Sequence, residues 1–209
     1  MRASIISAIS LFAIGSLAAP ETRNLHPLSD AAALKVANNF KGLISAYSTA
    51  LANSVLTSDV VDYSDSVETL IDGACPDGPV ALGTPTFSSL AAFEAGQGKQ
   101  RNIDFELLNV WHNAKTVTVR WRSSLPNPGP GPAPAVQEQV TGILVLETRF
   151  NGWYSAQPFL IAEIFSEFNS GAWLYDLKVI NPTCPPPPPS KRSIAEALPA
   201  MLVRGRSEK

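Results

Sequence analysis

The spacing of hydrophobic residues changes near residue 102, and this change limits the folds open to the chain more than any other feature. Upstream, apolar side chains recur with the period of an amphipathic α-helix, whereas downstream they alternate with polar ones as in a β-strand. Helices followed by a run of strands predict an α+β domain, in contrast to the alternating strands and helices of nucleotide-binding folds.

Serine caps, glycines and prolines mark the expected elements upstream of the change. Ser29 and Asp30 can begin the first helix, and Ser88 or Ser89 can begin the last one. Residues 72–87 must form a loop because they contain three glycines and three prolines. The expected elements are a helix at about 30–52, a helical segment at 52–59, a short acidic strand at 59–67 and a helix at 90–96.

Downstream of the change, four long strands and one short piece are expected. Asn113-Ala114 predicts a tight hairpin, and residues 126–135 (PNPGPGPAPA) predict a semi-rigid loop that projects from the sheet. A helix lying across this curved antiparallel sheet would leave a cone-shaped cavity. The strands are expected at 103–112, 115–123, 139–150 and 158–169, and the short piece at 172–177.

The N-terminus has the composition of a secretory signal peptide. Arg2 precedes an apolar stretch from Ile5 to Ile14, and small residues surround the expected cleavage point after Ala18. The protein is therefore expected to be secreted and extracellular. No later segment reaches the roughly 20 apolar residues that a membrane span requires, so no membrane partner is expected.

Five consecutive prolines, Pro185 to Pro189, predict a stiff extended segment and end the expected domain near Cys184. Lys191 and Arg192 follow, either as a cleavage site for a kexin-type protease or as a solvated charge pair. The expected organisation is a signal peptide at 1–18, a linker at 19–29, one domain at 30–184, and a proline-rich linker with a disordered tail at 185–209.

Cys75 and Cys184 are the two cysteines of the chain, and an oxidising compartment favours a disulfide between them. Two cysteines and two histidines at this spacing fit no zinc pattern, so neither a metal nor a cofactor is expected. The formal net charge of −2 gives no basic surface for a phosphate backbone, which argues against a nucleic-acid partner.

The order of these elements, with the segments LTSDVVDYSDSV, FSSLAAFEAGQG, VTVRWRS and SEFNSGAWLYDL, resembles the nuclear transport factor 2-like superfamily. Within it, the chain is similar to secreted SnoaL-like proteins of filamentous fungi over about residues 30–178. The resemblance implies an α+β cone in which N-terminal helices pack across a curved antiparallel sheet. It implies little about activity, because this fold carries isomerases, dehydratases, hydrolases and proteins without chemistry.

Similarity to the ketosteroid isomerases of this superfamily implies a tyrosine and a general base. Tyr47 matches the tyrosine that stabilises the enolate, and the base would lie among Asp62, Ser64 and Asp65. Leu146 occupies the place of the second, protonated acid, so half of the oxyanion hole is missing. Tyr47 can also be explained as a core residue, and the acidic residues as parts of helix ends and turns.

Glu163 is the third catalytic candidate, and its role depends on the alternation phase of the strand at 158–169. One phase turns an apolar face toward the cone, and hydrophobicity favours it. The other phase buries Glu163, whose raised pKa would then suit acid–base catalysis. The first face consists of Leu160, Ala162, Ile164, Ser166 and Phe168, and the second of Ile161, Glu163, Phe165 and Glu167.

The expected cavity favours a secreted protein that binds a small apolar molecule without catalysis. Two alternatives stay open. One is a cofactor-independent lyase, isomerase or cyclase acting on a polyketide- or terpenoid-like substrate, and the other is an extracellular protein-interaction module. A homodimer would use the outer face of the sheet. The side chains expected to line the cavity are Phe40, Leu43, Tyr47, Trp121, Leu144 and Leu146.

Overall fold

The structure of the chain is a computed structural model that describes residues 26–75, 78–128 and 136–183. Within these ranges the chain forms five helices and one five-stranded sheet, and no helix there is long and apolar enough to cross a bilayer. The elements in chain order are α1 (Asp30–Ser45), α2 (Thr49–Val55), β1 (Leu56–Tyr63), α3 (Asp65–Ile71), α4 (Leu90–Gln97), β2 (Glu106–His112), β3 (Thr116–Ser123), β4 (Val140–Phe150), β5 (Phe159–Phe168) and α5 (Ser170–Asp176).

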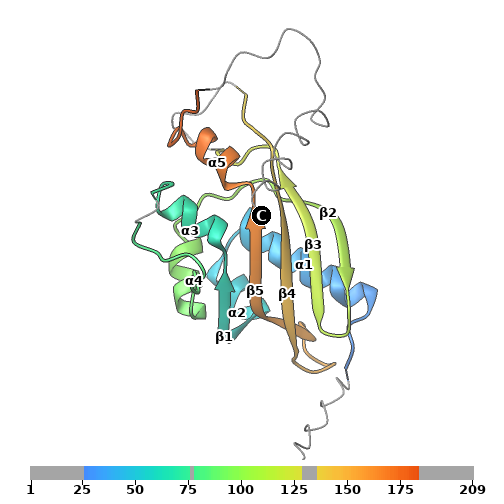
Figure 1. Ribbon diagram of the computed structural model, residues 1–209. Coiled ribbons are helices and arrows are strands. Elements are labelled where there is room, and N and C mark those ends of the chain that lie inside the picture. The colour runs from blue at the N-terminus through green and yellow to red at the C-terminus, as the bar shows by residue number, and fades with distance from the viewer. Residues whose placement is uncertain (1–25, 76–77, 129–135, 184–209) are drawn as a thin grey trace, which may run out of the picture.

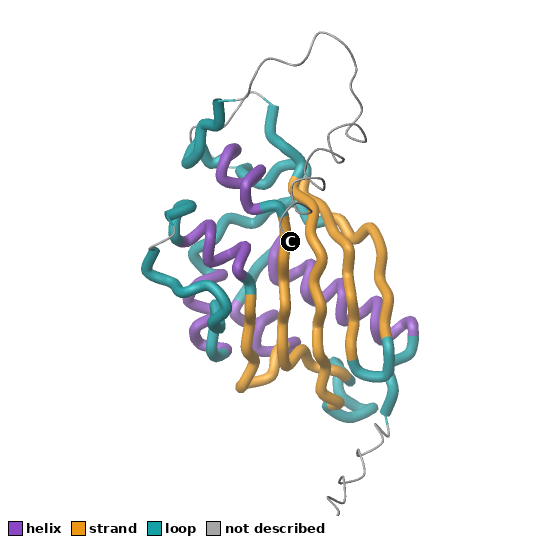
Figure 2. The backbone as a smooth tube through the Cα atoms, viewed as in Figure 1, coloured by secondary structure: helices purple, strands orange, loops and turns teal. Residues whose placement is uncertain are grey.

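The sheet confirms the predicted α+β class and adds a parallel pair of strands. β2 to β5 form the expected antiparallel meander. β1 pairs in parallel with β5, which gives the strand order β1-β5-β4-β3-β2. In Figure 1 and Figure 2, α1 crosses one face of the sheet and α3 and α4 lie beside β1. The other sheet face is left uncovered by the described helices.

Serine side chains begin four of the helices. Ser29, Ser48, Ser64 and Ser89 each accept a hydrogen bond from the backbone N–H three residues further on. The cap at Ser48 starts a new helix, so the single helix predicted at 30–52 is divided into α1 and α2. The helical segment predicted at 52–59 is also shorter than expected, because β1 already begins at Leu56.

The short strand predicted at 172–177 is wrong, because this segment belongs to α5. The Asn169 side chain accepts a hydrogen bond from Ala172 N–H and caps the first helical turn. Leu174 and Asp176 are buried on the inner side of the helix. Capping and tertiary packing therefore override the strand preference of the aromatic residues in this segment.

β5 contains an extra residue at Ala162. Glu163 is the register partner of Glu147 on β4, and Ile161 is the register partner of Thr148. Two residues on β4 are thus opposite three on β5, which is the pattern of a β-bulge. Because the side-chain period of a strand is 2, one extra residue exchanges the two faces of the strand.

The bulge decides which β5 side chains face the helices. Glu163, directly after it, is turned to the outer face and is exposed. The predicted phase that turns Ile161 inward therefore holds before the bulge. The predicted phase that turns Ile164 inward holds after it. The inward-facing residues are Phe159 and Ile161 before the bulge, and Ile164, Ser166 and Phe168 after it.

The folded domain includes residues before position 30. Leu28 is buried, and its N–H donates a hydrogen bond to the backbone oxygen of Ala114. The His26 ring stacks on Phe150 at a centroid distance of 3.9 Å. The linker predicted at 19–29 therefore belongs to the domain from residue 26 onward, while residues 1–25 lie outside the described ranges.

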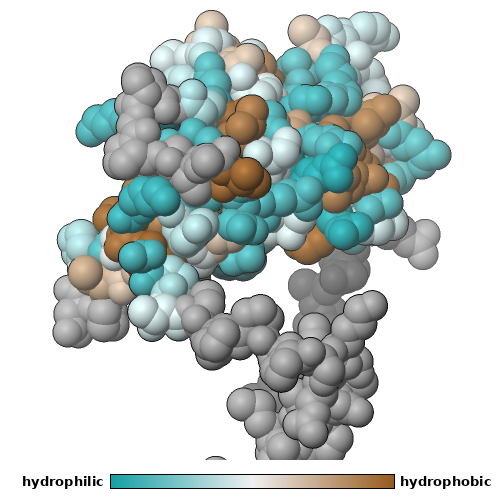
Figure 3. Space-filling model, turned by 90° about the horizontal axis from the view of Figure 1, so that it is seen from above, coloured by the Kyte–Doolittle hydropathy of each residue, from teal (hydrophilic) through white to brown (hydrophobic). Residues whose placement is uncertain are grey.

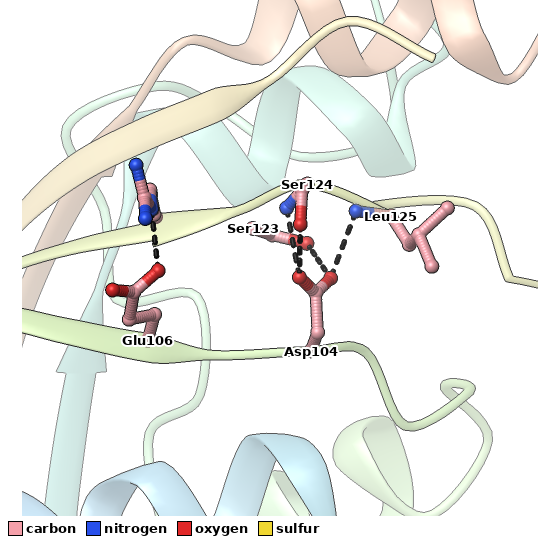
Figure 4. A network of polar contacts seen from close by, with 6 residues as sticks. Asp104, Glu106, Ser123, Ser124 and Leu125 are labelled. Atoms are coloured by element: carbon pink, nitrogen blue, oxygen red, sulfur yellow. Dashed lines mark hydrogen bonds and ion pairs between the residues drawn. The ribbon is translucent and has the colours of Figure 1, made fainter. Parts of the chain in front are cut away.

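A carboxylate holds the turn that follows β3, as Figure 4 shows. Asp104 accepts hydrogen bonds from Ser123 Oγ, from Ser124 N–H and Oγ, and from Leu125 N–H. Burial alone would raise the pKa of Asp104, but these hydrogen bonds lower it to about 2. The charged carboxylate thereby fixes the chain just before Pro126, which lines the cavity described below.

The uncovered face of the sheet carries a mainly apolar band of exposed and half-buried side chains. In register, the band crosses the sheet from Tyr63 through Phe165, Val145 and Thr118 to Trp111. The ring of Tyr63 stacks on that of Phe165, and Trp111 is 52% exposed. The homodimer predicted through this face would bury the band, and it stays a prediction.

Candidate ligand-binding and active site

A cavity of about 480 Å³ lies between the helices and the inner face of the sheet. This volume is within the range of small-molecule sites in proteins. Most of the wall is aromatic or aliphatic, and each of α1, α4, β3, β5 and α5 contributes at least one ring. The aromatic wall residues are Phe40, Phe87, Phe93, Phe105, Trp121, Phe168 and Trp173.

The rim of the cavity lies where α3 and the segments around residues 100 and 127 approach α5. Four lining residues, Ile71, Gln100, Arg101 and Pro128, are exposed to solvent and form this rim. Figure 3 looks onto the end of the molecule that carries α5 and shows hydrophobic side chains beside hydrophilic ones. The rim is the route by which a ligand would reach the apolar wall.

Asp62 lies in the cavity wall on β1. Its backbone is the register partner of Ile164 on β5 and exchanges two hydrogen bonds with Phe87 on its other side. Asp62 is 7% exposed, and its Oδ1 is buried without a hydrogen-bond partner in the described part of the chain. Burial, with a smaller contribution from the charge of Glu167, raises the pKa of Asp62 to about 7. Such a carboxyl group can accept or donate a proton near neutral pH.

Two further residues that are buried line the cavity with side-chain polar groups that have no partner among the residues described. Trp121 Nε1 is buried and donates no hydrogen bond. Gln97 is 4% exposed, and its side-chain amide makes no hydrogen bond. β5 and β4 separate β1 from β3, and Trp121 lies four residues along the strands from the register position of Asp62. The two backbones are therefore about 20 Å apart, by the usual strand spacing and rise per residue.

Two glycines let aromatic rings approach the backbone of the wall. A Cβ at Gly142 would lie 2.8 Å from Trp121 Cε2, so the indole can lie across β4 only because the side chain is absent. A Cβ at Gly96 would lie 2.3 Å from Phe87 Cε1, so Phe87 packs directly on α4. Both rings line the cavity, whose shape therefore depends on these two glycines.

The structure places two of the six predicted lining residues, Phe40 and Trp121, in the cavity wall. Leu43, Leu144 and Leu146 are at most 1% exposed and belong to the solid core that α1 forms with the sheet. These three leucines do not line the cavity, because α1 contacts the sheet directly on that side. Leu146 also leaves the inner face of β4 without the second acid of the isomerases.

Tyr47, the sixth predicted lining residue, lies outside the cavity. Because α1 ends at Ser45, Tyr47 falls in the link to α2, where its N–H donates a hydrogen bond to Asn102 Oδ1. Its hydroxyl donates to the backbone oxygen of Glu94. Tyr47 and Asp62 therefore do not form the tyrosine–carboxylate pair that the resemblance implied.

The remaining catalytic candidates do not line the cavity. Glu163 is exposed on the outer sheet face, because the bulge at Ala162 turns it outward. Ser64 caps α3, and the carboxylate of Asp65 accepts a hydrogen bond from Gly83 N–H. Among the catalytic candidates, Asp62 is the one that lines the cavity.

Several predicted sites lie outside the described ranges. These are the processing positions Ala18, Lys191 and Arg192 and the disulfide partner Cys184. Cys75 is exposed, and its pairing with Cys184 stays a prediction. In the parts of the chain that the structure describes, no group of three or more His, Cys, Asp or Glu side chains could hold a metal ion.

Three residues of the cavity wall have no local signal in the sequence. Gln97 lies near the end of the predicted helix at 90–96, but the sequence does not show which side of that helix meets the cavity. Arg101 follows in a segment without periodicity, and Trp173 lies in the segment predicted as a strand. Only the packing of α4 and α5 against the sheet brings these residues to one space.

Replacing Asp62 by Asn should change how stability depends on pH. The ordinary pKa of an aspartate is 3.8, whereas the folded chain keeps the Asp62 proton up to a pH of about 7. The wild type should therefore lose stability as the pH rises from about 4 to about 7, by on the order of 4 kcal/mol. Asp62→Asn should lack this decline and have the larger free energy of unfolding at pH 8, as measured by urea denaturation.

Glu163→Gln provides the matched control, because it removes a carboxylate from the exposed face of the neighbouring strand. It should keep the pH dependence of the wild type. A parallel decline in stability of wild type and Asp62→Asn between pH 5 and 8 would contradict the raised pKa of Asp62.

Comparison with known proteins places the chain in a family. Residues 26–180 match the family described as NTF2-like domain, and the curated proteins give no match.

Among solved structures, IdmH from Streptomyces antibioticus, provisionally assigned as a polyketide cyclase, is 12% identical to this chain. Its TM-score is 0.47, and the match covers 70% of this chain and 98% of that one. A protein from Jannaschia sp. CCS1, provisionally assigned as a SnoaL-like polyketide cyclase, is 10% identical with a TM-score of 0.47, over 72% and 94%. A protein with a ketosteroid isomerase-like fold from Catenulispora acidiphila, solved with trimethylamine, is 10% identical with a TM-score of 0.48, over 69% and 92%. By the family match, which covers most of its length, the chain belongs to the NTF2-like family.

Proposed function

We propose that the chain binds a small, largely apolar molecule in its cavity and that it does so outside the cell. The cavity carries the first part of this proposal, because it combines a volume of about 480 Å³ with a mainly aromatic and aliphatic wall. Unfilled apolar space and unpartnered buried polar groups both destabilise a fold. A ligand that fills the space and bonds to Asp62, Trp121 or Gln97 would offset both effects.

Proton transfer is the second candidate function, and Asp62 is the observation that favours it. A carboxylate in an apolar cavity is a stronger base than one in water, since burial disfavours its charged form. Asp62 would take a proton from an acidic C–H group of the bound molecule, as in a cofactor-independent isomerase or lyase acting on a polyketide- or terpenoid-like substrate. The Gln97 amide, on the helix α4 that packs against β1, is a wall group that could donate to a developing negative charge.

The binding proposal can be tested with N-phenyl-1-naphthylamine, an uncharged apolar dye that fluoresces in an apolar environment. Ser166→Phe adds a ring to the cavity wall on β5 and should weaken dye binding at least about tenfold, because the ring occupies the space of the ligand. Ala50→Phe adds the same ring at an exposed position on α2 and should leave the affinity unchanged. Equal affinities of the two variants would exclude this cavity as the binding site.

The proton-transfer candidate can be tested with 5-nitro-1,2-benzisoxazole, a flat apolar molecule. A carboxylate base removes its C3 proton while the N–O bond breaks, and the product is a coloured cyanophenolate. If Asp62 is the base, the rate should rise with pH around a midpoint of about 7. Asp62→Asn should lower the rate at least about a hundredfold, whereas Glu163→Gln should not. A rate equal to that of buffer, with dye binding intact, would reject catalysis and leave the binding function.

The extracellular part of the proposal rests on the sequence of residues 1–18. Mass spectrometry of protein recovered from the medium, without reduction, should show an N-terminus at Ala19 and a disulfide between Cys75 and Cys184. An intact Met1 would contradict the signal peptide. Two free thiols would contradict the disulfide.

A further inference from the structure

The cavity has one ionisable side chain deep in its wall and another at its rim. Asp62 and Arg101 are the two lining residues with ionisable side chains in the described part of the chain. Asp62 is buried, and its pKa is raised to about 7 by burial and the charge of Glu167. Below that pH the deep end is uncharged, so the guanidinium of Arg101 at the rim is the charge that an entering molecule meets.

The backbone on both sides of Arg101 is held in place. Gln100 N–H donates a hydrogen bond to the backbone oxygen of Gln97 at the end of α4. On the other side, Asn102 Oδ1 accepts from Tyr47 N–H, and Ile103 N–H donates to the backbone oxygen of Ile44. Arg101 is therefore presented to the rim by a fixed segment between α4 and β2.

The guanidinium of Arg101 has no ion-pair or hydrogen-bond partner among the residues described. Arg122 and Arg149, by contrast, pair with Glu106 and Asp59. An unpaired arginine beside an apolar opening can bind an anionic group that stays partly in water, because both charges then keep much of their hydration.

We propose that the ligand is an amphipathic organic acid, whose carboxylate binds Arg101 at the rim while its apolar body lies against the aromatic wall. This inference rests on the proposed binding function and adds the chemical class of the ligand. The reverse orientation would bury the carboxylate beside Asp62, where it would lose its hydration and have no cation to pair with. An amine would have to pass the positive charge at the rim before it could reach Asp62.

Three ligands with the same apolar chain can distinguish these cases: decanoate, decan-1-ol and decylamine. Each is used at pH 6.5 and low ionic strength to displace N-phenyl-1-naphthylamine from the full chain. Decanoate should displace the dye at a concentration at least about fivefold lower than decan-1-ol, since only the carboxylate pairs with Arg101. Decylamine should be the weakest competitor.

Arg101→Gln should reduce the preference for decanoate over decan-1-ol to within about twofold and leave decan-1-ol unchanged. Arg101→Lys keeps the charge and should restore most of the preference. Arg120→Gln removes an exposed arginine from the outer sheet face and should behave like the wild type. Salt should weaken decanoate binding to the wild type more than to Arg101→Gln.

The inference is overturned if Arg101→Gln keeps the preference for decanoate, if it weakens decan-1-ol equally, or if decylamine is the best competitor. In each of these cases the dye still binds, so the proposed binding function stands. Failure of the dye to bind the wild type would instead reject the binding function itself, together with the inference that rests on it.

Discussion

The extra residue at Ala162 is the constraint on which both faces of the sheet depend. β5 lies between β1 and β4, so its side chains reach the cavity on one face and solvent on the other. With the bulge, Ile161 and Ile164 point to the same side and Glu163 points outward. If Ala162 instead took part in regular alternation and Ile161 still faced inward, Glu163 would face the apolar interior, where an unpartnered carboxylate is strongly destabilising.

The same sheet tolerates a buried carboxylate one strand further on, at Asp62. Its position is determined from two sides, by pairing with Ile164 and by the hydrogen bonds with Phe87, so the side chain cannot turn to solvent without disrupting β1. The fold therefore keeps a buried carboxyl group that lowers the free energy of unfolding of the chain above pH 7. Such an arrangement is typical of functional sites, where stability is lost in exchange for a group held ready to react or bind.

Membership of the NTF2-like family accounts for the cone but not for what the cone holds. The tyrosine expected by resemblance to the isomerases is absent from this cavity, because Tyr47 lies beyond the end of α1. Leu146, which the sequence places where the isomerases have their second acid, lies in the core. The wall instead combines Asp62 with the unpartnered groups of Trp121 and Gln97. The polar groups of this wall therefore differ from those that the resemblance to the isomerases implied.

The sequence by itself determined the elements whose signals are local. The cap at Ser29, a serine cap at position 88 or 89, the antiparallel meander and the α+β order all follow from short-range hydrogen bonding and hydrophobic period. The sequence identified Asp62 only as one of several candidate catalytic residues. Alternation with a period of 2 shows that a strand has two faces, but it does not show which face lies inside. Tertiary structure decided that question through the bulge at Ala162 and the parallel pairing of β1 with β5. The pairing of β1 with β5 joins residues about a hundred positions apart. The bulge depends on the partner strand β4. No local sequence pattern encodes such contacts.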